Sequence, residues 1–361
     1  MTNHPFRWGI LGAAQIARRN WQAIFHTGDS TITAVASRDL GRSRQFIADC
    51  QGVMPMASAP EAFGSYEELL ASRNVDAVYI PLPTGVRKDW VIRAAKAGKH
   101  VLCEKPCATN AADLEEMLEA CRAAGVQFMD GVMFMHSLRM PAMRKVLDDG
   151  TSIGSMRRIT SNFSFLGQGS FMDTNIRANG SLEPLGCLGD LGWYCVRFSL
   201  WAMNWQVPKV VSARLSAHAG PNPVPMDFSA ELLFENGVSA GFGCAFTAAF
   251  QQWAIVSGTT GQMRVNDFVL PCAGGEVAFD ITELGSIADH LSAKFILKTR
   301  RHAVSEHGES HPTSQDTCMF RNFGALVRKG TPSTEWPEIS LKTQRVVDAC
   351  YAAAVEASRK S

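Results

Sequence analysis

Hydrophobic and polar positions follow one pattern up to about residue 130 and a different pattern beyond it. In the first part, short apolar runs alternate with longer segments whose apolar residues recur at helical spacing. The runs predict strands at Phe6–Leu11, Thr31–Ser37, Ala77–Ile80, His100–Cys103 and Val126–Met129. The spaced segments predict helices at Gln15–Ile24, Gly41–Cys50, Tyr66–Ala71, Lys88–Ala97 and Asn110–Ala124. This order predicts an α/β domain over residues 1–130, a doubly wound parallel sheet of the Rossmann type that binds its ligand beyond the carboxyl ends of its strands.

From residue 131 onward, predicted strands follow one another with turn residues between them. They are Met156–Leu166, Val210–Ala217, Phe228–Phe234, Val238–Phe250, Trp253–Gly258, Gln262–Val265 and Glu276–Ile281. Such a succession predicts an α+β domain over residues 131–361, with a mostly antiparallel open sheet that packs on helices through one face. We expect a closing helix over about 339–359.

The composition of the chain excludes several classes of partner. The 361 residues have a formal net charge of +1, which offers no strong field for nucleic acid or an anionic membrane. No apolar run is long enough to span a bilayer, and we recognise no secretory signal. The ten cysteines form no Cys-x-x-Cys pair and no zinc spacing, which indicates reduced, mostly buried thiols, a cytoplasmic location and no metal site. His302, His307 and His311 fall in a polar stretch that we interpret as a solvated loop.

The first predicted strand leads into a glycine turn that opens the first helix. Gly12–Ala17 fits the phosphate-binding pattern G-x-G-x-x-A, except that Ala14 stands where a second glycine normally lets the backbone approach a pyrophosphate. A strand before the turn and a helix after it are the context in which this motif binds a dinucleotide. The helix N-terminus would supply free N–H groups and the positive end of its dipole. A tight turn without a ligand is the alternative interpretation.

The residues after the second predicted strand distinguish NAD from NADP. A carboxylate there would bind the ribose 2′-hydroxyl of NAD, whereas this chain has Ser37 and Arg38, with Arg42 one turn further on. A guanidinium matches a 2′-phosphate in charge and shape, so the sequence favours NADP over NAD. Asp39 is the nearest acid, and solvated surface arginines are the alternative.

Four motifs, in order along the chain, resemble one enzyme family. They are Gly12–Ala17, Pro81-Leu82-Pro83-Thr84, Glu104-Lys105-Pro106 and Gly186–Tyr194, followed by the helical segment Thr343–Asp348. Together they resemble the glucose–fructose oxidoreductase/inositol dehydrogenase (Gfo/Idh/MocA) family over almost the whole chain. Within that family the chain is most similar to the dimeric dihydrodiol dehydrogenase and NADP-dependent D-xylose dehydrogenase branch. The motifs and the resemblance imply cofactor contacts from Gly12, Ala13, Ala14, Gln15, Ile16, Ser37, Arg38, Arg42, Pro81, Leu82, Pro83, Thr84, Glu104 and Lys105.

The same resemblance implies which residues move the hydroxyl proton. Lys105 is expected in the active site, where partial burial and the cationic nicotinamide would lower its pKa, while Glu104 and Pro106 set the backbone turn. Asp190 and Tyr194 are four residues apart and share a helical face. Many relatives carry His where Tyr194 stands. We expect Tyr194 to be the general acid/base and Lys105 to polarise the hydroxyl across the domain boundary, although the roles could be exchanged, and Tyr194 could instead lie at the core edge.

The remaining candidates concern the substrate. Asp190 would orient either catalytic group or bind a substrate hydroxyl, and Asn175 and Arg177 would line the sugar side. His136 is a weaker candidate, because such a histidine is more often packed than functional. Thr84 and Arg87 stand where relatives often have Asn and His.

These features predict an NADP-dependent oxidoreductase acting on a hydroxyl of a sugar, polyol or cyclic diol, such as D-xylose, glucose or a dihydrodiol. A reductase for a keto or anhydro sugar is one alternative. A non-catalytic NADP-sensing regulatory protein is another. The resemblance also implies a homodimer or higher homo-oligomer formed through the open sheet.

Overall fold

In the computed structural model, which describes residues 4–219, 223–272, 275–284 and 296–360, the apolar runs of the N-terminal part form six parallel strands. The sheet order is β3-β2-β1-β4-β5-β6. The strands are β1 Phe6–Leu11, β2 Ser30–Ala36, β3 Glu61–Phe63, β4 Ala77–Ile80, β5 His100–Cys103 and β6 Phe128–Asp130. The order reverses between β1 and β4, which is where a Rossmann sheet leaves a crevice for its ligand. The predicted fold class of this part is therefore confirmed.

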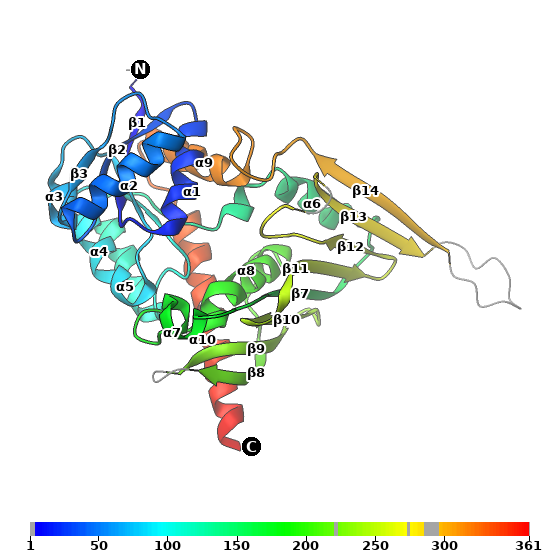
Figure 1. Cartoon of the computed structure of the whole chain (residues 1–361). Helices are drawn as coiled ribbons and strands as arrows, with labels where there is room; N and C mark the ends of the chain where they lie inside the picture. Colours follow the sequence, from blue (N-terminus) through cyan, green and yellow to red (C-terminus); the bar gives the residue numbers. More distant parts are fainter. Residues whose placement is uncertain (1–3, 220–222, 273–274, 285–295, 361) are drawn as a thin grey trace, which may run out of the picture. The chain divides into compact units, whose positions relative to one another are not determined.

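Helices pack around this sheet (Figure 1). They are α1 Gln15–His26, α2 Leu40–Val53, α3 Tyr66–Ala71, α4 Thr84–Lys96, α5 Ala111–Ala123 and α9 Gln315–Arg328. The last of these comes from far along the chain and lies beside α1 (Figure 1). Its Phe320 ring lies edge-on to Trp8 at 5.0 Å, so a distant segment completes the core of the sheet. The chain divides into one unit of Met1–His136 and Glu309–Gln344 and a second of Ser137–Gly308 and Arg345–Ser361.

The second unit contains an eight-stranded sheet in the order β14-β13-β12-β11-β7-β10-β9-β8. Its strands are β7 Met156–Leu166, β8 Val210–Ala219, β9 Val224–Leu233, β10 Ser239–Ala245, β11 Thr247–Gly258, β12 Gly261–Val265, β13 Val277–Leu284 and β14 Leu297–Val304. All neighbours are antiparallel except β7 and β10, which are parallel. The mostly antiparallel sheet is therefore confirmed.

Two details of this sheet correct the prediction. The segment 238–250 is not one strand, because β10 ends at Ala245 and β11 starts at Thr247 on the other side of β7. His302 does not lie in a loop, because it belongs to β14 and its ring stacks on Phe279 at 5.1 Å.

Helices cover one face of the second sheet. They are α6 Arg139–Asp148, α7 Phe171–Thr174, the short π-helix Leu188–Gly192, α8 Trp193–Ala202 and the C-terminal part of α10 Glu335–Lys360. Every residue of α8 is buried, and α8 packs on β7 and β10. No helix in the described part of the chain is both long and apolar enough to cross a membrane.

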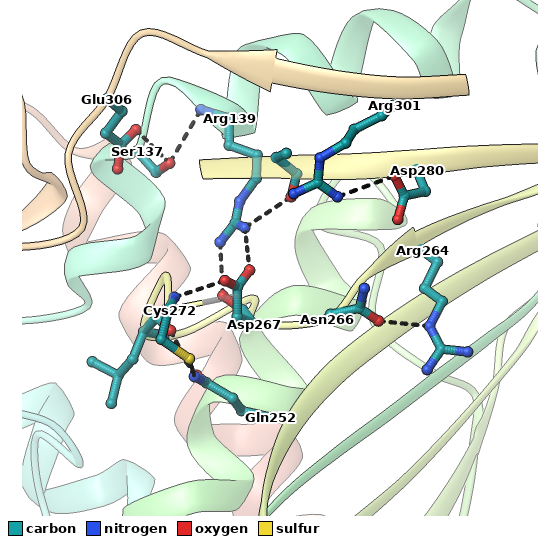
Figure 2. A network of polar contacts seen from close by, with 12 residues as sticks. Ser137, Arg139, Gln252, Arg264, Asn266, Asp267, Cys272, Asp280, Arg301 and Glu306 are labelled. Atoms are coloured by element: carbon teal, nitrogen blue, oxygen red, sulfur yellow. Dashed lines mark hydrogen bonds and ion pairs between the residues drawn. The ribbon is translucent and has the colours of Figure 1, made fainter. Parts of the chain in front are cut away.

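A buried ion pair fixes α6 to this sheet (Figure 2). Arg139 Nη1 lies 2.6 Å from Asp267 Oδ1, with side chains only 1% and 3% exposed. Arg139 also donates to the carbonyls of Ala278 at 3.1 Å and Asp267 at 2.9 Å, while Asp267 Oδ2 accepts from the Cys272 amide at 2.7 Å. Buried charges need such compensation, so this network fixes residues 267–272, which follow β12.

Candidate functional site

The glycine turn between β1 and α1 has the geometry of a phosphate-binding loop. Gly12 has φ +117°, and a Cβ at this position would lie 2.9 Å from Leu82 Cδ2, so the position requires glycine. Ala14 is extended at the N-cap of α1, and among the described residues no side chain caps this helix. The first turn of α1 contains no acid, and its Ile16 is 41% exposed. These features fit a pyrophosphate at the helix N-terminus.

The turn after β2 presents two arginines. Asp39 is the N-cap of α2, where its Oδ1 accepts from the Arg42 amide at 2.7 Å. Arg38 and Arg42 are exposed, and both guanidinium groups act to lower the pKa of Tyr66, which burial raises overall. Arg42 Nη2 also lies 3.4 Å from the Ala13 carbonyl of the glycine turn. Arg42 therefore lies beside the glycine turn, while the Asp39 carboxylate caps α2.

A series of hydrogen bonds among buried and half-buried polar groups anchors the loop after β5. Asn20 on α1 donates to the Tyr79 hydroxyl at 2.6 Å, and that hydroxyl donates to Glu104 Oε1 at 2.6 Å. Glu104 Oε2 accepts from the Lys105 amide at 3.2 Å. Burial raises the pKa of Glu104, against the lowering effects of the Tyr79 hydrogen bond and the positive charges of Lys105 and Arg87. Through these hydrogen bonds Glu104 fixes the backbone next to Lys105.

Arg87 contacts the same loop from α4. Its side chain is almost completely buried, at 3% exposed. Nε donates to the Leu82 carbonyl at 2.9 Å, and Nη1 donates to the Glu104 carbonyl at 2.8 Å. Short hydrogen bonds also join Nη2 to the Leu82 carbonyl and Nη1 to the Pro106 carbonyl. One guanidinium therefore binds the segments that follow β4 and β5.

In the second unit, an ion pair lies next to Tyr194. Arg177 Nε lies 2.7 Å from Asp190 Oδ2, with side chains 43% and 15% exposed. Asp190, then Glu183 and Tyr194, raise the pKa of Arg177, while burial lowers it. Asp190 lies in the π-helix that leads into α8, a feature frequent at functional sites.

The two flanking candidates have clear structural positions. Asn175 Oδ1 accepts from the Arg177 amide at 3.0 Å and so caps the short helix Ile176–Ala178. Tyr194 is buried on α8, with its ring 5.7 Å from Phe163. The second unit therefore brings Asn175, Arg177, Asp190 and Tyr194 together.

His136 lies in a packed environment of the first unit. Its ring stacks on Trp336 at 4.6 Å, and its Nδ1 lies 3.1 Å from Asn322 Nδ2. A role in substrate binding stays a prediction. In the described residues, no group of three or more His, Cys, Asp or Glu side chains is arranged to bind a metal ion.

The sequence interpretation missed Asn20 and Tyr79 and treated Arg87 only as a departure from relatives. Tyr79 carried a usable signal, because a phenol in a strand buried on both faces needs a hydrogen-bond partner. Arg87 carried none, since an arginine on a predicted helix is normally solvated.

Comparison with known families agrees with this geometry. The model of an oxidoreductase family with an NAD-binding Rossmann fold matches residues 6–132. The model of the GFO/IDH/MocA C-terminal domain matches residues 140–264. The chain belongs to the GFO/IDH/MocA oxidoreductase family. The predicted family and enzyme class are therefore confirmed.

Individual relatives of this GFO/IDH/MocA protein are similar over most of its length. Mouse trans-1,2-dihydrobenzene-1,2-diol dehydrogenase is 33% identical over 267 residues, which are 73% of this chain and 76% of the relative. An NADP-dependent D-xylose 1-dehydrogenase of Haloferax volcanii is 30% identical, with 96% and 97% covered. A 3-ketoreductase of Actinomadura kijaniata, solved with NADP and TDP-benzene, has a TM-score of 0.82 at 28% identity, with 97% and 98% covered.

Proposed function

We propose that this chain is an NADP-dependent oxidoreductase that transfers a hydride between the nicotinamide and a hydroxyl carbon of a sugar, polyol or cyclic diol. The observation that carries the proposal is the Lys105 loop at the carboxyl edge of the Rossmann sheet. Tyr79, Glu104 and Arg87 fix this loop through partly buried hydrogen bonds, beside a turn that fits a dinucleotide. The names of the Haloferax and mouse relatives support sugars and diols as the substrate class.

NADP is the proposed cofactor rather than NAD. Arg42 supplies positive charge beside the glycine turn, and exposed Arg38 follows β2 four residues before it, which suits a 2′-phosphate. Asp39, which could otherwise accept from a ribose hydroxyl, accepts from a backbone amide of α2. The NADP in the name of the Haloferax enzyme and in the solved ketoreductase supports the same choice.

The proposed roles use residues of both units. NADP supplies the hydride acceptor when it is bound. Lys105 polarises the substrate oxygen, Tyr194 moves its proton, and Asp190 orients the phenol. Asn175 and Arg177 line the substrate side. A lysine and a tyrosine were also the residue types substituted in solved variants of the ketoreductase. A regulatory protein that only senses NADP has no need for such a pair.

A keto-sugar reductase is a second candidate, favoured by the similarity to the 3-ketoreductase. It needs the same residues with the hydride moving in the opposite direction. One experiment tests both candidates: the absorbance of NADPH is followed with aldoses, polyols and trans-diols plus NADP, and with keto sugars plus NADPH. We expect turnover in at least one arm and a preference for NADP over NAD. Two results together contradict the enzyme proposal: NADP binds tightly but no substrate in any arm is turned over, and Lys105→Ala behaves like the wild type.

A cytoplasmic homodimer is part of the proposal. All ten cysteines lie among the described residues as thiols rather than disulfides, which supports a reducing compartment. The open face of the second sheet carries a shallow groove lined by residues such as Arg158, Glu231 and Trp253, which offers polar and aromatic contacts to a second copy. Sedimentation at several concentrations, with Trp253→Glu as the variant, tests the dimer. A wild-type protein that is monomeric throughout contradicts it.

A further inference from the structure

We infer that Arg87 is a positioning residue whose buried guanidinium joins the cofactor loop after β4 to the Lys105 loop after β5. The inference rests on the proposed function only in giving Lys105 a role in the reaction. Its structural content is that cofactor binding and the position of the lysine depend on one buried side chain that binds main-chain carbonyls of both loops.

The donor geometry of Arg87 requires a guanidinium. Nε and Nη2 contact the Leu82 carbonyl, while Nη1 contacts the carbonyls of Glu104 and Pro106. The planar fork of arginine points its donors in fixed, divergent directions. A lysine ammonium is a single point charge and cannot span carbonyls that belong to two different loops. The fork therefore sets the separation of these loops.

The connection extends to the phosphate turn. Leu82, whose carbonyl Arg87 contacts, has its side chain against Gly12, where a Cβ would come within 2.9 Å of Leu82 Cδ2. Arg87 therefore links the carboxyl ends of β4 and β5 directly and that of β1 through Leu82. These three strand ends surround the crevice where the sheet order reverses.

The Lys105 loop receives two independent anchors. Tyr79 binds the Glu104 side chain, and Arg87 binds the main-chain carbonyls on both sides of Lys105. The Tyr79 anchor reaches the Lys105 amide through Glu104 Oε2. Arg87 holds the carbonyls of Glu104 and Pro106, so its loss should displace the lysine even when Glu104 stays in place.

The test compares Arg87→Lys and Arg87→Ala with a matched control, Arg93→Lys. Arg93 lies on the same helix α4, is 53% exposed and pairs with Glu67 at the surface. Each purified full-length variant is assayed for kcat, for KM with NADP and for its unfolding midpoint. The rate at which an amine reagent labels Lys105 is measured relative to the exposed Lys96 by peptide mass spectrometry, without cofactor. Arg87→Ala is also assayed with millimolar guanidinium and, separately, methylammonium.

We expect folded Arg87→Lys to lose about 100-fold in kcat, as a displacement of a catalytic group by about 1 Å does, and to raise KM for NADP. The Lys105/Lys96 labelling ratio should change several-fold in both Arg87 variants and stay constant in Arg93→Lys. Guanidinium, and not methylammonium, should restore part of the activity of Arg87→Ala.

A folded Arg87→Lys with wild-type kcat and an unchanged labelling ratio overturns the inference. The labelling ratio needs no turnover, so it tests the position of Lys105 even if no substrate reacts. Failure of the proposed function appears separately, as the absence of hydride transfer by the wild-type protein.

Discussion

Tyr79 and Glu104 form a 2.6 Å hydrogen bond inside the first unit, with the phenol as donor and the carboxylate as acceptor. Burial raises the pKa of both groups, and Asn20 donates to the same phenol at 2.6 Å. A buried carboxyl group is costly unless it is fully hydrogen-bonded. Ionised Glu104 therefore lowers the free energy of unfolding, while its hydrogen bonds fix the loop that carries Lys105.

The raised pKa of Glu104 predicts a specific pH dependence of stability. Its value in the folded protein exceeds the ordinary 4.5, so its contribution to stability is fully present below pH 4.5 and is lost as the pH rises through the raised value. Glu104→Gln has no such titration. Urea unfolding of both proteins between about pH 4 and about pH 8 should show the wild type losing free energy of unfolding relative to the variant as the pH rises. A constant difference, or one of opposite sign, contradicts the burial argument.

The Arg139–Asp267 pair should behave as a buried ion pair does. Arg139→Met leaves a buried carboxylate without its partner and should lower the free energy of unfolding by about 3–5 kcal/mol. The double variant Arg139→Met/Asp267→Leu should recover most of that loss, because neither charge remains. The exposed Arg93–Glu67 pair is the control, and Arg93→Met should cost about 0–1 kcal/mol. Equal losses in the free energy of unfolding at the two pairs would contradict the claim that Arg139 and Asp267 form a buried ion pair.

Cofactor choice is tested by Arg38→Ala. A charge-assisted contact with a 2′-phosphate contributes about 1.5–3 kcal/mol, so the Kd for NADP should rise about 10- to 100-fold while the Kd for NAD changes little. Arg44→Ala, on the exposed side of α2, is the control and should leave both values unchanged. Calorimetric titration gives the two constants. An equal rise in Kd for NAD and NADP would contradict a contact between Arg38 and the 2′-phosphate.

Arg177 and Asp190 should act as a unit. Their ion pair lies one helical turn before Tyr194, so losing either partner changes the charge near the phenol. In a double-mutant cycle on kcat/KM, Arg177→Gln and Asp190→Asn should be coupled by about 0.5–3 kcal/mol. Strictly additive effects would mean that the two residues act independently.

Much of the fold could be predicted because its pattern is local. The bounds of β4, β5 and α3 were predicted as observed, since apolar runs there end at clear turn or helix-starting residues. β3 was missed because it has three residues and none is buried, and β14 because it is a largely polar edge strand with little burial. β10 and β11 were merged because no turn residue separates Ala245 from Thr247.

Candidate site residues could be proposed from sequence where a motif carries them. Lys105 and the Gly12 turn were proposed in this way, and their roles stay predictions. Arg87 was not proposed, because its partners are main-chain carbonyls that leave no trace in the side-chain pattern. The core contribution of α9 was missed for a related reason: its partner Trp8 lies at the other end of the chain.

The central claim is that Lys105 and Tyr194 move the proton that accompanies hydride transfer to NADP. The most direct test is the single-turnover rate of NADPH formation at saturating NADP for the wild type, Lys105→Met and Tyr194→Phe, on the best substrate of the panel. The account predicts that each variant binds NADP yet loses about 10²- to 10⁴-fold in rate. A wild-type rate in both variants would contradict it.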